Sequence, residues 1–123
     1  MTFLWIAAAL GLTTFVVHTF VGSRYAVPAL IAAEATLPKA TIWLNYLCWH
    51  IVSGLLLILA LALATVATGR IHIDAAIPIA AVFCWISVWS VLTTFKAHIP
   101  AYRFPASWLG GATALFILLG LVR

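Results

Sequence analysis

Hydrophobic residues fill four long stretches of the chain that contain no Asp, Glu, Lys or Arg. These stretches are residues 1–23, 40–69, 75–95 and 104–122. Each reaches the roughly 17–25 residues that a helix needs to cross about 30 Å of hydrocarbon, and none shows the alternation typical of barrel strands. The pattern therefore predicts an all-α fold, an integral membrane four-helix bundle that forms a single domain, residues 1–123. The expected spans are about 2–22, 41–67, 75–95 and 105–122.

Composition supports a surface that meets lipid. Of the 123 residues, 67% are apolar and only 7% are charged, with a mean hydropathy of +1.25. Soluble domains carry about a quarter charged residues, and disordered chains have low hydrophobicity, so both classes are excluded. The net charge of +4 comes from basic residues scattered over the connections, which form no patch for nucleic acid. The partners we expect are the lipid bilayer, other membrane proteins and further copies of the chain.

The basic residues also predict an orientation. Four spans place residues 21–41 and 96–104 on one side, side A, and both termini with residues 68–74 on the other, side B. Side A then carries Arg24, Lys39, Lys96 and Arg103, against Arg70 and Arg123 on side B. Because cytoplasmic loops carry the excess of Lys and Arg, side A is expected to be cytoplasmic and both termini to lie outside.

The first connection is the longest and is mostly apolar. Residues 29–37, bracketed by Pro28 and Pro38, are too few to span a membrane, so we expect a short interfacial helix along side A. Glu34 is the only carboxylate on this side. It is expected to form a salt bridge with Arg24 or Lys39, with contact to a histidine as the alternative.

The first and third predicted helices match each other at a shift of 80 residues. Residues 3–18 and 83–98 are identical at 8 of 16 positions, including Trp, Phe and His positions. Since these two helices run in the same direction, a parallel duplication of helix 1 in helix 3 would explain the match. Coincidence in a biased alphabet is the alternative, because the second and fourth stretches show little similarity.

Polar side chains inside the spans are candidate functional residues, because they are costly in hydrocarbon unless they have a partner or a function. His18, His50 and His98 all fall toward side A, and imidazoles from three helices can bind a transition metal or haem. We therefore expect these three histidines as metal or cofactor ligands, with Tyr46 and Thr14 beside them. The alternative is that each imidazole only makes hydrogen bonds at a helix end or between helices.

Two short elements carry a resemblance to a known group of proteins. They are the run from His18 to Gly22 and, about thirty residues later, the pair Trp49-His50. The chain resembles small, uncharacterised bacterial four-helix inner-membrane proteins that share a His-x3-Gly element and a Trp-His pair. Glu often follows the glycine in that group, whereas Ser23 follows it here. The resemblance implies a multi-pass protein of the bacterial inner (cytoplasmic) membrane and singles out these four residues, without implying an activity.

Three functions remain compatible with these features. The spans contain no charged residue and no evident nucleophile with its base, which disfavours an enzyme and leaves no catalytic residue to name. We expect a small accessory or assembly subunit that acts within the bilayer. The alternatives are a membrane protein that binds haem, copper or quinone through His50 with His18 or His98, and a histidine-based transporter of small solutes.

Overall fold

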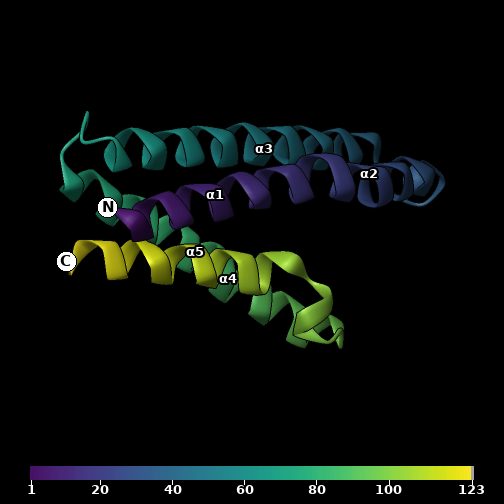
Figure 1. Ribbon diagram of the computed structural model, residues 1–123. Coiled ribbons are helices and arrows are strands. Elements are labelled where there is room, and N and C mark those ends of the chain that lie inside the picture. The colour runs from purple at the N-terminus through teal and green to yellow at the C-terminus, as the bar shows by residue number, and fades with distance from the viewer. Residues whose placement is uncertain (123) are drawn as a thin grey trace.

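The computed structural model describes residues 1–122, and within this range every regular element is a helix. The α-helices are α1 (Thr2–Val16), α2 (Ser23–Ala32), α3 (Lys39–Ala67), α4 (Ala76–Ala97) and α5 (Pro105–Leu121). The short elements are the π-helical turn η1 (Val17–Gly22) and the 3-10 turns η2 (Ala33–Ala35), η3 (Ile73–Ala75) and η4 (Ala101–Arg103). Because α1, η1 and α2 run on as one rod (Figure 1), the described chain forms four helical rods. The predicted all-α fold with four helices is confirmed.

Three of the four rods are long enough and apolar enough to cross a membrane. They cover Thr2–Ala35, Lys39–Ala67 and Ile73–Ala97, with 34, 29 and 25 residues. The fourth rod, Pro105–Leu121, is apolar but has 17 residues, which is the lower limit for a span.

The rods form two antiparallel hairpins (Figure 1). The first hairpin consists of the α1–η1–α2 rod and α3, and the second consists of α4 and α5. α1 packs extensively on both α3 and α5, whereas α3 and α4 touch only sparsely. Both ends of the chain and the α3–α4 connection lie at one end of the molecule, and the turns inside the two hairpins lie at the other (Figure 1).

The packed core lies toward the end that holds the chain termini. The four largest fully buried side chains lie there, and they come one from each rod: Leu4, Leu63, Phe83 and Ile117. Within residues 17–55, by contrast, only Ile42 and Ser53 are buried. Apolar burial therefore supports the bundle at one end and supports the turn of the first hairpin very little.

Close contacts of two glycines show how far the first hairpin extends. A Cβ at Gly120 would lie 2.8 Å from Cδ2 of Leu4, so these two residues are level along the antiparallel pair of α5 and α1. Pro105, where α5 begins, lies 15 residues before Gly120. In an antiparallel pair it is therefore level with the residue 15 positions after Leu4, which is about residue 19 of the first rod.

The second contact places the same level on α3. A Cβ at Gly11 would lie 3.4 Å from Cβ of Ala60, which makes the start of α5 level with about residue 52 of α3. Residues 20–51 lie beyond that level. We call this part of the first hairpin the arm, and Figure 1 shows it reaching past the turn of the second hairpin.

The arm departs from the sequence prediction. The helix continues through Ser23 to Ala32 and does not stop near residue 22 to begin again near residue 29. The expected interfacial helix over 29–37 is therefore wrong. Arg24 ends the charge-free stretch, but one exposed charge does not end a helix. Pro28 is tolerated inside α2 at an exposed position, where the missing N–H removes one helical hydrogen bond.

Candidate functional site

The most specific contacts within the first hairpin converge on Trp49, at the base of the arm. The rings of His18 and Trp49 are stacked, with centroids 4.2 Å apart and planes inclined by 18°. Nε2 of His18 lies 3.4 Å from the carbonyl oxygen of Trp49, and the indole Nε1 donates a 2.9 Å hydrogen bond to Oγ of Ser23. We call His18, Gly22, Ser23 and Trp49 the Trp49 clamp.

Gly22 provides the space that the indole occupies. A Cβ at this position would lie 2.7 Å from Cζ2 of Trp49 and 2.9 Å from Cη2, which is closer than real side chains approach. Any larger residue would displace the ring or push the two rods apart. Glycine therefore sets the spacing of the rods where support from α5 ends.

The π-helical turn explains why His18, Gly22 and Ser23 all contact the indole of Trp49. In an α-helix, residue i+4 lies above residue i and residue i+5 turns away. A π-helix bonds i to i+5, so both i+4 and i+5 lie close to the position above i. η1 covers Val17–Gly22, and it thereby brings Gly22 and Ser23 to the same side as His18.

One hydroxyl in η1 lacks a partner. Thr13, Thr14, Thr93 and Thr113 each donate to the carbonyl oxygen four residues earlier. Oγ1 of Thr19 is the one buried side-chain N or O atom in residues 1–122 without a hydrogen bond. A buried hydroxyl without a hydrogen bond costs about 1–3 kcal/mol of folding free energy. The contacts around the π-helical turn must therefore stabilise it by more than this cost.

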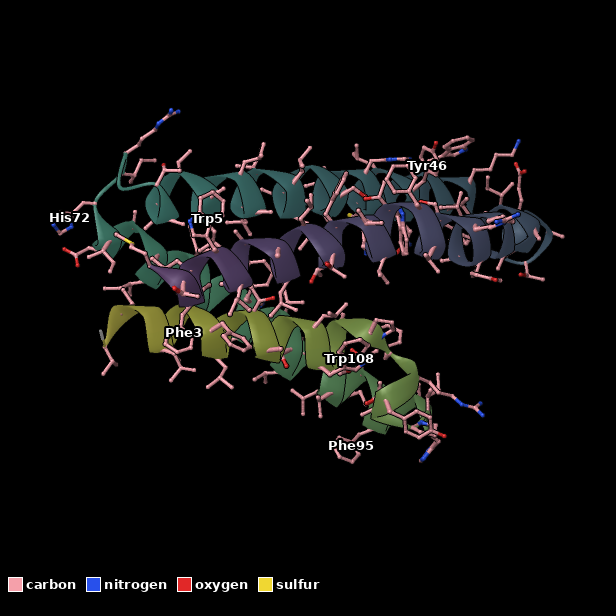
Figure 2. All side chains as sticks on the ribbon, viewed as in Figure 1. Phe3, Trp5, Tyr46, His72, Phe95 and Trp108 are labelled. Carbon is pink, nitrogen blue, oxygen red and sulfur yellow. The ribbon has the colours of Figure 1, made fainter. Side chains whose placement is uncertain are left out.

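His50 has other neighbours than His18. It is exposed, and its ring meets Tyr46 edge-on with centroids 4.5 Å apart. Tyr46 lies on the outer side of α3 (Figure 2), where it also contacts Trp43 at 5.6 Å. Successive helical residues are rotated by about 100°, so the residue after Trp49 does not face the clamp. The recorded ring contacts of His50 and His18 are thus made with different residues, Tyr46 and Trp49.

His98 lies at the turn of the second hairpin. It is exposed and left-handed, with φ of 55°, and it closes α4 with hydrogen bonds from His98 N to Phe95 O and from Ile99 N to Thr94 O. This is the Schellman arrangement of a helix end. Among residues 1–122, no three His, Cys, Asp or Glu side chains are close enough together to hold a metal ion. The three histidines expected as ligands therefore do not converge.

The remaining predicted site residues have local roles. Thr14 is buried and donates to the carbonyl oxygen of Leu10 at 2.8 Å, within its own helix. Glu34 pairs with Lys39, with Oε1 and Nζ 3.6 Å apart, which confirms one of the two predicted salt bridges. Both side chains are exposed, and such pairs contribute little to stability.

The resemblance to the His-x3-Gly and Trp-His group pointed to three of the four clamp residues. Polar stripes in the sequence gave no reason to choose Ser23, because an α-helical register turns it away from His18. Apart from that resemblance, nothing in the sequence pattern marks Trp49 as a residue that joins the two rods. The clamp offers an imidazole, an indole N–H and a hydroxyl, and its two hydrogen bonds run between the rods. It is built to join the two rods of the first hairpin.

Comparison with known proteins assigns this chain to no group. The resemblance carried by His18, Gly22, Trp49 and His50 therefore stays a prediction. No protein-family model, no curated protein and no solved structure matches the chain.

Proposed function

We propose that this protein is a small integral membrane accessory or assembly subunit whose arm binds another membrane protein. The observation that carries the proposal is the difference in length between the two hairpins.

The surfaces of the long rods support insertion into a bilayer. In the most apolar window of each rod, only 28%, 22% and 28% of the residues are buried. The other residues present apolar side chains outward, far more than a soluble monomer normally exposes. Lipid tails would cover this surface without further cost.

The first hairpin is too long to lie wholly within the hydrocarbon. A helical rod of 34 residues is about 50 Å long, against about 30 Å of hydrocarbon. Fitting the whole rod inside would need a tilt above about 50°, whereas spanning helices tilt by about 0–40°. Within this range of tilts, about 10–20 Å of the arm extends into the headgroup region and the water beyond it.

Large apolar side chains stay exposed on the arm where lipid tails no longer cover it, beside charged residues such as Glu34 and Lys39. Tyr25 is 74% exposed and Leu44 is 60% exposed, and Ile31, Leu37 and Trp43 are exposed as well. Tyr and Trp suit the headgroup region, but aliphatic side chains gain nothing there. Exposed apolar surface of this kind marks contact with another protein.

The proposed location follows the sequence expectation. We place the protein as a multi-pass protein in the bacterial inner membrane, with the arm on the cytoplasmic side and both termini outside. The excess of Lys and Arg on side A supports this orientation, although Arg123, on side B, lies outside the described residues. The resemblance on the His-x3-Gly and Trp-His elements supports the bacterial location.

We also propose that α1 and α4 derive from one ancestral helix. Matched positions have matched surroundings: Trp5 and Trp85 are both exposed, and Thr14 and Thr94 are both buried. Each of the two helices packs against an antiparallel partner in its own hairpin. These similarities support a duplicated hairpin whose two copies have since diverged in length.

Site-specific photo-crosslinking in intact membranes tests the function. A photo-reactive residue replaces Leu44 on the arm, and the matched control replaces Leu118 on α5, which is 47% exposed. We expect a discrete protein adduct from position 44 and lipid adducts only from position 118. A differently tagged second copy shows whether the adduct is the chain itself. Equal labelling from both positions, or no protein adduct at position 44, would contradict the proposal.

A further inference from the structure

An apolar groove runs along the outer face of α4 and ends at a lysine. It has a volume of about 400 Å³ and is lined by Trp89, Leu92, Thr93, Phe95 and Lys96. Phe95, at its rim, points away from the other rods (Figure 2). Trp85 extends the same face one turn further, with its ring 5.6 Å from that of Trp89. The groove is thus a continuous aromatic and aliphatic surface with one cation at its end.

Lys96 has no anionic partner in the described part of the chain. The sequence contains two carboxylates, and each has another neighbour: Glu34 is paired with Lys39, and Asp74 lies 3.1 Å from Nδ1 of His72. Arg103, in the turn that follows α4, adds a second positive charge at the same end. The end of the groove therefore carries positive charge that no residue among 1–122 neutralises.

We propose that this groove binds one anionic phospholipid, with the phosphate at Lys96 and an acyl chain along Leu92, Trp89 and Trp85. The proposal rests on the membrane insertion argued above. The rise from Trp85 to Lys96 is about 16 Å, which is about half of the 30 Å hydrocarbon and so matches one leaflet. Lys96 lies in the last turn of α4, where its aliphatic stem can cover the groove while the ammonium group reaches the headgroups.

Charge complementarity selects an anionic lipid over a zwitterionic one. A basic side chain near the membrane surface contributes about 1 kcal/mol to binding of anionic lipid, a factor of about five in affinity. A zwitterionic headgroup carries its own cation and gains much less from Lys96. The apolar lining alone would accept either lipid.

Native mass spectrometry of the full chain, released from nanodiscs with equal amounts of phosphatidylglycerol and phosphatidylcholine, tests the proposal. We expect one retained phosphatidylglycerol per chain and about fivefold weaker retention in Lys96→Gln. Arg70→Gln is the matched control, because it removes a cation at the opposite end of the molecule. In Trp89→Ala, total lipid retention should fall while the preference for phosphatidylglycerol remains.

Three results would overturn the proposal. The first is equal retention of the two lipids by the unchanged chain. The second is an equal loss of phosphatidylglycerol retention in Lys96→Gln and Arg70→Gln. The third is a dimer of the chain without bound lipid, provided that Trp89→Ala dissociates this dimer. Extraction of the chain from membranes by alkaline carbonate is measured separately. Extraction would refute membrane insertion itself, whereas an inserted chain without lipid preference would refute only the lipid site.

Discussion

The two hairpins begin with similar helices and end in different ways. Residues 3–18 and 83–98 share half of their positions, yet the first rod runs on past His18 to Ala32 while α4 ends at Ala97. Pro100 disfavours helical geometry at Ile99, and the chain turns at His98. After His18 the next proline is Pro28, ten positions further on. Helix length here is decided by the residues that follow the similar segment, and not by the segment itself.

The two hairpins are also held together differently. In the second, Ser87 Oγ donates to Ser107 O at 2.5 Å, and the hydroxyls of Ser90 and Ser107 are 2.9 Å apart. Ser90 and Ser107 are buried beside a continuous core. The arm of the first hairpin has almost no buried side chains, so the hydrogen bonds and ring contacts that join its two rods come mainly from the Trp49 clamp. Loss of the clamp should therefore free the arm and leave the second hairpin intact.

Trp49→Ala should have the largest effect on this contrast. The change removes a half-buried ring, its stacking on His18 and its hydrogen bond to Ser23, so we expect a loss of about 3 kcal/mol in unfolding free energy. Dodecyl sulfate titration measures the loss, and hydrogen exchange should rise in α2 but not in α5. Trp43→Ala, which removes an exposed ring from the same helix, is the control. Equal effects of the two changes would show that the clamp has no special role.

Gly22→Ala should have the next largest effect. The new Cβ would overlap the indole, and overpacking of this kind costs about 1–3 kcal/mol. The matched control is Gly54→Ala, since a Cβ at Gly54 has no heavy atom within 4 Å. Alanine is the better helix former by about 1 kcal/mol, so the control should be neutral or slightly stabilising under the same titration. A neutral Gly22→Ala would contradict the tight spacing described for the base of the arm.

His98→Gly should have the smallest effect and the opposite sign. A left-handed residue other than glycine costs about 1–2 kcal/mol, so glycine should stabilise the end of α4 by about 1 kcal/mol. Denaturant titration of the second hairpin, monitored by hydrogen exchange, measures the gain. His18→Gly is the contrast, because it should destabilise the first hairpin through loss of the ring and of helix propensity. A loss of bound metal from the purified His98→Gly protein would instead restore the ligand role that the sequence suggested.

Charge-free stretches predicted three of the four rods closely. The expected spans 41–67, 75–95 and 105–122 correspond to α3, α4 and α5 within two residues at each end. The first rod is longer than the predicted span 2–22. The charge of Arg24 ends the charge-free stretch there, but a charge marks where the hydrocarbon ends and does not end a helix. Hydropathy indicates whether a side chain meets lipid or water. Where a helix ends depends instead on local backbone geometry, which residues such as Pro100 restrict.

The candidate site was only partly predictable. The sequence placed His18, His50 and His98 toward the same side, but it could not give the rotation of α3 that turns Trp49 inward and His50 outward. It also could not reveal the π-helical turn that brings Ser23 onto the face of His18. Both features depend on the register between rods, which is set by contacts such as that of Gly11 with Ala60.

The central claim is that the arm extends out of the hydrocarbon while the second hairpin stays within it. Measuring the depth of both parts in a bilayer tests this claim most directly. Single spin labels at Ile31, near the tip of the arm, and at Val88, in the middle of α4, are compared in lipid vesicles after Cys48 and Cys84 are replaced by Ala. Both positions are exposed, so packing does not distort the comparison. The label at 31 should collide more with a water-soluble nickel chelate than with oxygen, and the label at 88 should do the reverse. Equal, oxygen-dominated collisions at both positions would place the arm in the hydrocarbon and contradict its role in binding a partner.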